Sequence, residues 1–286
     1  MARILIAGCG YVGSRLAELL LADGDTVFGL KRSPDGLPPG VEPVPADVTR
    51  PRSLENLPTR LDALVYAVSP SGGGEAAYRA AYPEGFRNAL EAARAGSPGL
   101  GRTLLVSSTG AYGYTDGRWV DEATPPGPSG TRGEILVEAE TQAAQGPPAG
   151  VALRLGGIYG PGRSYTVRKV LSGQAGCPEK GVYSNRIHRD DAAGAARHLL
   201  HLDDPESLYL GVDREPAELR EVYRWIAEEG GGPDPCADTG GEAWEAAGRR
   251  GSNKRCRSDR LVDSGFTFRY PTFREGYGAL LEEVRS

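Results

Sequence analysis

Three glycines near the N-terminus have a spacing that suits the phosphates of a dinucleotide. They belong to a Gly-x-Gly-x-x-Gly motif, whose six residues are Gly8, Cys9, Gly10, Tyr11, Val12 and Gly13. Gly8 permits a tight turn, Gly10 lets a pyrophosphate approach the backbone, and Gly13 lets a helix pack closely on a strand. Because the motif follows an apolar run and opens a helical pattern, it predicts dinucleotide binding at a helix N-terminus. A glycine turn needed only for packing is the alternative.

Two basic residues follow the second apolar run, where NAD-specific sites usually place an acid that holds the ribose 2′-hydroxyl. Lys31 and Arg32 stand there, and no acid is adjacent to them. A guanidinium binds phosphate in a bidentate manner, so Arg32 supported by Lys31 suits a 2′-phosphate. The pair favours NADP over NAD as cofactor and leaves NAD possible. A solvated basic pair at a strand end is the alternative meaning.

Short apolar runs that alternate with helical patterns must position these residues. The runs cover 3–7, 26–30, 41–45, 63–69, 103–107, 151–155 and 208–212, and the helical patterns cover 12–23, 75–95, 131–145 and 190–202. Such alternation predicts an α/β fold, a doubly wound parallel Rossmann sheet that binds its ligand at the carboxyl ends of the strands.

The pattern changes after residue 213, where a helix near 216–229, a Gly- and Pro-rich stretch at 229–241 and a helix near 272–284 follow. We assign 1–165 and 187–213 to an NAD(P)-binding Rossmann domain, and 166–186 and 214–286 to a small C-terminal lobe of the substrate-binding type. A basic stretch at 249–257 suits a substrate phosphate, although a solvated loop is the more frequent meaning of such a run.

Composition narrows the range of partners. The 286 residues carry a net charge of −5, which argues against a nucleic-acid-binding surface. No run approaches the roughly 18 apolar residues of a membrane span, and the N-terminus lacks the layout of a signal peptide. We expect a cytoplasmic protein with a small-molecule substrate, no nucleic acid and no membrane partner. Whether the chain forms a homodimer is left open.

The cysteines and histidines predict no metal site. Cys9, Cys177, Cys236 and Cys256 are too scattered for a zinc knuckle or a redox pair, so we expect four unrelated thiols. His198 and His201 share a helix face, but no acidic or thiol partner lies at ligand spacing in the sequence.

Five further blocks follow in a meaningful order. They are Asp47-Val48, Ala67-Val68-Ser69, the run from Val106 to Gly113 that includes Ser107, Ser108 and Thr109, the run from Leu153 to Arg163 that includes Ile158, and the run from Arg186 to Asp191. Together with the glycine motif they resemble the short-chain dehydrogenase/reductase superfamily. The likeness is to its extended branch of NAD-dependent epimerases and dehydratases, and within it to an atypical, epimerase-like subgroup. It extends to Asn253-Lys254-Arg255 and Tyr270-Pro271 in the C-terminal lobe.

The resemblance implies roles for these residues. Asp47 and Val48 would lie against the adenine. Ala67, Val68, Ser69, Ser107 and Ile158 would line the cofactor, and Ser108 would stand at the position of the catalytic serine. The histidine of the block at 186–191, His188, could move protons, but in the family this box mainly anchors a helix.

The central pair of the family's chemistry is missing. The family places Tyr-x-x-x-Lys about 25 residues after the serine, and here Gly130 and Glu134 occupy those positions. The tyrosine, with a pKa lowered by the lysine, would take the proton of a substrate hydroxyl. A Tyr-x-x-x-Lys does occur at Tyr165 and Lys169, either by chance or as a relocated acid/base pair.

Two functions therefore stay open. The first is an epimerase, dehydratase or reductase that acts on a sugar-nucleotide-like or small carbonyl substrate. In that reading Ser108 polarises the reacting oxygen, and a non-standard group or a water held by Thr109 moves the proton. The second is a non-catalytic NADP(H)-binding sensor or scaffold that has lost the chemistry.

Overall fold

The computed structural model describes residues 1–127, 130–178, 180–237 and 253–285. Seven parallel strands form the central sheet in the order β11-β7-β5-β4-β1-β2-β3. Their bounds are β1 Arg3–Ala7, β2 Thr26–Lys31, β3 Glu42–Pro45, β4 Ala63–Tyr66, β5 Arg102–Ser108, β7 Val151–Leu155 and β11 Leu208–Gly211. The order reverses beside β1, as in doubly wound sheets. The predicted fold class is confirmed.

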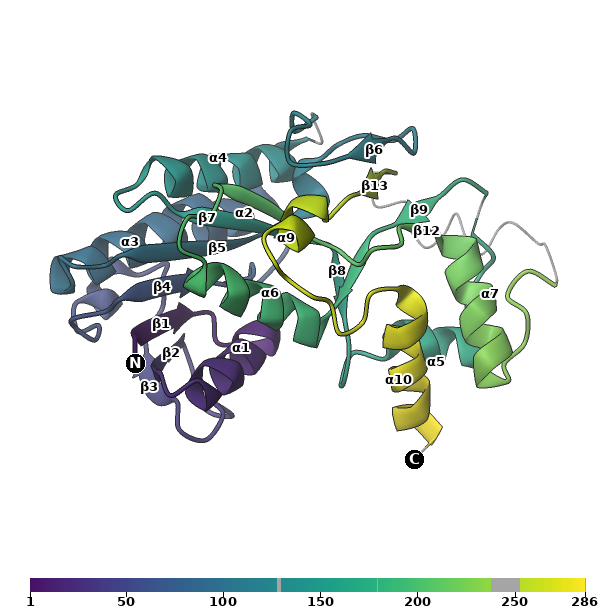
Figure 1. The fold of residues 1–286 in the computed structure, drawn as a ribbon, viewed down its shortest axis with the longest axis horizontal. Coiled ribbons are helices and arrows are strands. Elements are labelled where there is room, and N and C mark those ends of the chain that lie inside the picture. Colours follow the sequence, from purple (N-terminus) through teal and green to yellow (C-terminus); the bar gives the residue numbers. More distant parts are fainter. Residues whose placement is uncertain (128–129, 179, 238–252, 286) are drawn as a thin grey trace.

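Helices cover both faces of the sheet because the side chains of its strands alternate between them. Ile4 and Ile6 of β1 belong to a core with α1 (Tyr11–Ala22) and α6 (Arg189–His201). Leu5 and Ala7 belong to a second core with α3 (Gly85–Gly96) and α4 (Thr131–Gln145). Figure 1 shows these two helical layers on opposite sides of the strands. Both faces are thus apolar, which explains the continuous apolar runs of the strands.

The helix predicted over 75–95 is interrupted. The structure has α2 at Glu75–Arg79, a π-helical turn at Ala80–Glu84, and then α3. Pro83 lies within that turn. Proline lacks the backbone N–H that an α-helix needs and its ring clashes with the preceding turn, so the wider turn accommodates it.

The C-terminal helices have a core of their own. This core unites α5 (Tyr165–Leu171), α7 (Leu219–Gly230) and α10 (Phe273–Arg285), which lie side by side at one end of the molecule (Figure 1). A further short helix, α9, spans Asp259–Asp263. The boundaries proposed for the small lobe stay a prediction.

Pairs of very short strands join this part to the sheet, and the sequence did not predict them. They are β8 (Gly157–Tyr159) with β10 (Arg186–His188), β9 (Tyr183–Ser184) with β12 (Ala217–Glu218), and β6 (Trp119–Val120) with β13 (Arg255–Cys256). Runs of two or three residues carry no periodicity that a sequence pattern could reveal.

The expectation of four unrelated thiols is wrong. Cys177 and Cys236, 59 residues apart, form a disulfide that links the segment after α5 to the segment after α7. Cys9 and Cys256 are buried free thiols. Spacing alone could not reveal the pair, because the fold of the C-terminal part brings two distant loops together.

The sequence offers His198 and His201 no acidic partner at ligand spacing, but the fold brings one close to His201. His201 Nε2 lies 3.7 Å from Oδ2 of Asp25, which precedes β2. The packing of α6 on α1 brings these residues together, and no local spacing encodes such a contact.

Among the described residues, no helix is both long enough and apolar enough to cross a bilayer.

Candidate functional site

A groove of about 740 Å³ lies along the carboxyl ends of β1, β2 and β4. It collects all but two of the residues predicted to hold a cofactor: Gly8, Gly10, Tyr11, Val12, Lys31, Arg32, Asp47, Val48, Ala67, Val68, Ser69 and Ile158. The two exceptions are Gly13 and Ser107. The groove therefore occupies the edge of the sheet where the fold places a dinucleotide.

The three glycines of the motif have different tasks. Gly8 has a φ of 88°, and a Cβ there would lie 2.6 Å from the backbone of Ala67. A Cβ on Gly13 would lie 2.6 Å from the carbonyl oxygen of Gly8. A Cβ on Gly10 would meet nothing nearer than 3.9 Å. Gly8 and Gly13 thus let the backbones pack, whereas Gly10 leaves open space above the start of α1, where a pyrophosphate fits.

Tyr11 ties the glycine loop to the segment after β8. Its hydroxyl donates a hydrogen bond to the Pro161 carbonyl at 2.9 Å. The guanidinium of Arg163 lies 3.9 Å from the Tyr11 ring centroid, and Arg163 also lines the groove. Arg163 was not among the residues predicted from the sequence to hold the cofactor, although it ends the run from Leu153 to Arg163. A cation at this edge of the groove complements phosphate.

A basic corner closes the groove at the end of β2. Arg32 is exposed and its Nη1 lies 3.4 Å from Ser71 Oγ across the groove, whereas Lys31 Nζ donates to the Asp35 carbonyl. Burial raises the pKa of Asp47, but hydrogen bonds from Thr49 and the charges of Arg32 and Arg50 outweigh it and leave that pKa lowered. The corner thus pairs an ionised carboxylate with a guanidinium that is free to meet a ligand.

The hydroxyls after β5 differ in their accessibility. Ser108 is half-buried, and its Oγ accepts a hydrogen bond from the Gly110 N–H at 3.1 Å. Thr109 is buried. Tyr112 is fully buried, it donates to the Asp121 carbonyl at 2.6 Å, and burial raises its pKa to about 12. Of these side chains, Ser108 is the least buried.

Ser107 faces the protein interior instead of the groove. Its Oγ donates to Glu140 Oε1 at 2.5 Å, and the same carboxylate binds Arg154 through contacts of 2.9 and 2.5 Å. The Arg154 guanidinium lies 4.5 Å from the Tyr112 ring centroid. This buried network joins α4 to β5 and β7 below Ser108. A glutamate and an arginine within two otherwise apolar patterns were the signal that sequence reasoning missed.

Gly130 and Glu134, which stand in the sequence where the family has its tyrosine and lysine, lie at the start of α4. Gly130 directly precedes α4 with a φ of 73°, and Glu134 in the first turn is exposed. The buried carboxylate of α4 belongs to Glu140 instead.

The second Tyr-x-x-x-Lys lies apart from the groove. Tyr165 begins α5 and is 71% exposed, and Lys169 Nζ lies 5.9 Å from its ring centroid. Neither residue lines the groove. Ser108 and Thr109, which are consecutive in the sequence, do not line the groove either.

The block at 186–191 anchors secondary structure. His188 precedes α6 and its Nδ1 accepts the Asp190 N–H at 3.2 Å, and Asp191 accepts the N–H groups of Arg269 and Tyr270. Burial lowers the pKa of His188 to about 4, so the ring stays neutral and keeps its acceptor.

The fold and the groove define a Rossmann-type protein of the dinucleotide-binding class. The chain belongs to the NAD dependent epimerase/dehydratase family, whose model matches residues 4–204.

Relatives support this over most of the chain. The 3-diazoavenalumate denitrifying reductase of a Streptomyces species is 30% identical over 260 residues, 82% of this chain and 83% of that protein. Protein YeeZ of Escherichia coli K12 is 32% identical over 221 residues, 73% of this chain and 77% of YeeZ. A solved structure from Methylobacillus flagellatus, described as a candidate NAD-dependent epimerase/dehydratase, is 36% identical with a TM-score of 0.83. That match covers 100% of this chain and 99% of the other.

Substitution of Gly10 should separate binding from folding. We expect Gly10→Ala to keep the melting temperature of the native protein and to weaken NADPH binding by about tenfold or more, which corresponds to about 1.4 kcal/mol. The added methyl has room in the free protein and occupies the space of the pyrophosphate. Calorimetric titration and thermal unfolding check this. Gly8→Ala is the matched control and should lower the melting temperature. Unchanged NADPH affinity in Gly10→Ala would contradict the assignment of the loop.

His188 should make folding acid-sensitive. Between about pH 6.5 and pH 4, His188 is protonated in the unfolded chain but neutral in the folded protein, because its pKa is lowered on folding. The free energy of unfolding therefore falls as the pH falls through this range. We expect His188→Asn, which can still cap α6 but does not titrate, to lose about 1–3 kcal/mol of that pH dependence. Urea unfolding at pH 7 and pH 4.5 measures it. Equal pH dependence in both proteins would show that His188 is not responsible.

Proposed function

We propose that this protein is an NADP(H)-dependent oxidoreductase or epimerase that acts on a small carbonyl or sugar-nucleotide-like substrate. One observation carries the proposal: a single groove combines a glycine loop with open space at Gly10 and an exposed guanidinium, Arg32, at the end of β2. The first feature suits a pyrophosphate and the second a ribose 2′-phosphate.

Residues of the groove would hold the cofactor as follows. The first turn of α1 has no side-chain cap, so its free N–H groups can bind the pyrophosphate. Arg163 would add a positive charge beside Tyr11. Asp47 and Val48 would border the adenine, and Ile158 the nicotinamide. NAD is the competing cofactor, because Asp35 also lines the groove and its carboxylate accepts the Ser33 hydroxyl.

The chemistry would depend on Ser108. A bound nicotinamide supplies hydride transfer. Ser108 would donate a hydrogen bond to the reacting oxygen of the substrate. A water molecule held near Thr109 would carry the proton, because Tyr112 is buried with a raised pKa and the tyrosine of the family is replaced by Gly130. For Tyr165 and Lys169 to transfer the proton instead, α5 would have to move toward the groove, because neither residue lines it.

The Streptomyces relative, named as a reductase, favours an enzyme over a non-catalytic sensor or scaffold. We place the substrate between the Rossmann domain and the small lobe at 166–186 and 214–286. In the extended branch that this sequence resembles, the C-terminal segments play this part.

The choice of cofactor can be tested at Arg32. Arg32→Ala should weaken NADPH binding by about 1.5–3 kcal/mol, the usual contribution of a hydrogen bond to a charged group, and should leave NADH binding unchanged. Fluorescence titration with both nucleotides measures the two affinities. Arg52→Ala, which removes an exposed arginine outside the groove, is the control and should bind NADPH normally. Equal losses for NADPH and NADH would show that Arg32 only shapes the turn.

Catalysis can be tested by following NADPH oxidation with a panel of aldehydes, ketones and sugar nucleotides. Once a substrate is found, Ser108→Ala should lower kcat by about 100-fold, within the range of acid–base and hydrogen-bonding contributions. Tyr165→Phe should leave kcat unchanged. A loss of kcat in Tyr165→Phe but not in Ser108→Ala would instead assign the proton transfer to Tyr165 of α5. No turnover with any compound, together with intact NADPH binding, would favour the sensor.

A further inference from the structure

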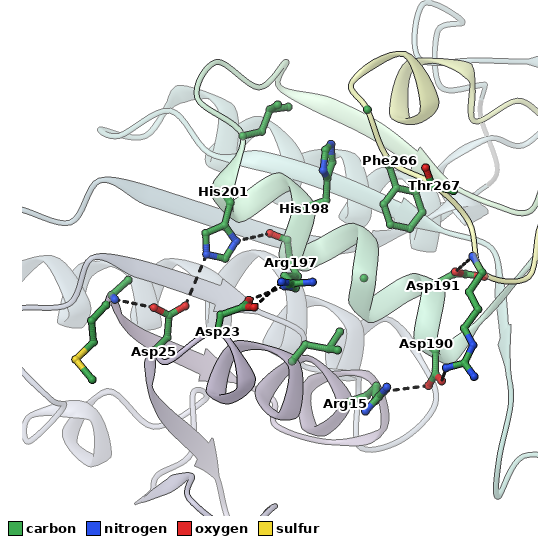
Figure 2. Close-up of a pocket in the computed structure, with 17 residues that line it drawn as sticks. Arg15, Asp23, Asp25, Asp190, Asp191, Arg197, His198, His201, Phe266 and Thr267 are labelled. Atoms are coloured by element: carbon green, nitrogen blue, oxygen red, sulfur yellow. Dashed lines mark hydrogen bonds and ion pairs between the residues drawn. The ribbon is translucent and has the colours of Figure 1, made fainter.

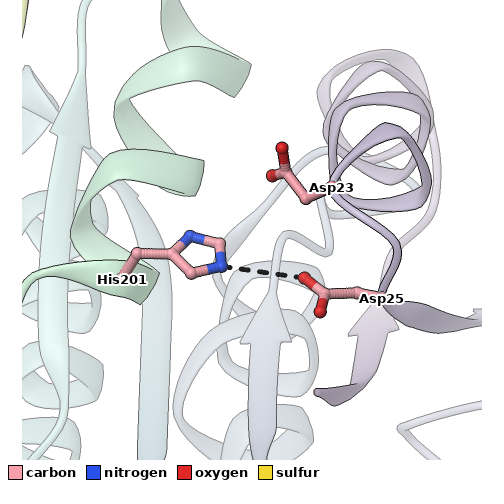
Figure 3. A group of neighbouring side chains, drawn as sticks. All are labelled: Asp23, Asp25 and His201. Carbon is pink, nitrogen blue, oxygen red and sulfur yellow. Dashed lines mark ion pairs between the residues drawn. The ribbon is translucent and has the colours of Figure 1, made fainter. Parts of the chain in front are cut away.

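A second cleft, of about 930 Å³, lies at the amino edge of the sheet, away from the cofactor groove. It extends along α1 and α6 to the turn that joins α1 to β2, the segment at 265–269 also lines it, and Figure 2 shows its charged side chains. At one end of this cleft, Asp23 and Asp25 of that turn lie beside His201 at the end of α6, which is far away in the sequence (Figure 3).

We propose that Asp23, Asp25 and His201 form a binding site for a divalent transition cation of the zinc class. One potential ligand atom from each residue lies within 4.8 Å of the others. One imidazole and two carboxylates are a common donor set for Zn²⁺, which often keeps a water molecule as its fourth ligand. Mg²⁺ and Ca²⁺ prefer oxygen ligands alone, so the imidazole favours zinc over both.

The orientation of His201 supports the proposal. Its Nδ1 lies 2.8 Å from the Arg197 carbonyl, and a carbonyl only accepts, so Nδ1 carries the hydrogen of the neutral ring. The lone pair then resides on Nε2, which faces Asp25 Oδ2 at 3.7 Å. This distance is too long for a hydrogen bond. It suits two ligands of one cation, since two bonds of about 2.0–2.1 Å span up to about 4 Å. A backbone carbonyl that fixes the tautomer is also typical of metal-binding histidines.

Asp25 supplies the second, independent observation. Its side chain is 6% exposed and its Oδ1 accepts the Ala2 N–H at 2.7 Å. Its Oδ2 is buried and receives no hydrogen bond from any residue that the structure describes. A buried carboxylate oxygen without a donor is costly, and a bound cation beside His201 would remove that cost.

Asp23 completes the set from the exposed rim. Arg197 binds both of its carboxylate oxygens, which fixes the carboxylate near the other two ligands. Each oxygen keeps a second lone pair that a metal can use. The positive charge of Arg197 opposes the cation, so we expect Arg197→Ala to bind the metal at least as tightly as the native protein.

The test uses the full-length protein, stripped of metal by a chelator and titrated with Zn²⁺ against a chromophoric competitor. We expect one Zn²⁺ per chain, no competition from Mg²⁺, and a rise in melting temperature with Zn²⁺. His201→Ala should weaken binding by more than about 100-fold, because even partners outside the ligand shell contribute about 10–100-fold. His198→Ala is the matched control, since this histidine lies on the same helix and in the same cleft but bonds Ser264. It should bind Zn²⁺ normally.

Asp25→Asn gives a second variant in case His201→Ala does not fold, and it should also lose tight binding. Visible absorption of the Co²⁺-loaded protein, present in the native chain and absent in both variants, reports the ligands directly. Binding that is not saturable at one ion per chain overturns the proposal, as does an equal loss in His198→Ala and His201→Ala.

Discussion

The close packing of the glycine loop against the start of α1 and the end of β4 fixes the positions of the other segments at the carboxyl edge of the sheet. A side chain at Gly8 would collide with the strand-end backbone at Ala67, and one at Gly13 would collide with Gly8 itself. Without those side chains, α1 can start directly above β1 and beside β4, and its uncapped N-terminus reaches the groove. The position of Tyr11 follows from this start, and Tyr11 in turn holds the segment after β8 through Pro161.

The other half of the site depends on buried charge. Glu140 and Arg154 are almost fully enclosed, and each would be costly alone. Their mutual contacts, together with Ser107 and the Tyr112 ring, fix α4 against β5 and β7. The network therefore sets the distance between the first turn of α4 and the strand end that carries Ser108. The end of β5 is held here by a buried ion pair, although Nη1 of Arg154 finds no hydrogen-bond partner among the described residues. At the glycine loop the close contact is between backbones instead.

Periodicity was enough to predict the seven strands, the helices of the sheet apart from the interruption at Ala80–Glu84, and the edge where the groove lies. The glycine motif, Lys31 and Arg32 then located most of the groove, because each follows a strand directly. Contacts between distant segments could not be foreseen. Cys177 and Cys236, or His201 and Asp25, meet only through packing of whole elements. Ser107 was expected to line the cofactor but faces the interior, because a shift of one residue along a strand exchanges its two sides.

The vacant tyrosine position reflects the backbone as well as the residue type. Gly130 adopts a φ of 73° immediately before α4, a conformation that glycine enters freely and that tyrosine adopts only with strain. A tyrosine could not simply occupy this point, although the space around it is open. The start of the helix would have to change together with the side chain, and Glu134 would have to exchange its charge. The backbone conformation at Gly130 thus disfavours a tyrosine at this position. Proton transfer through Ser108, as we propose it, would therefore not need a tyrosine at the start of α4.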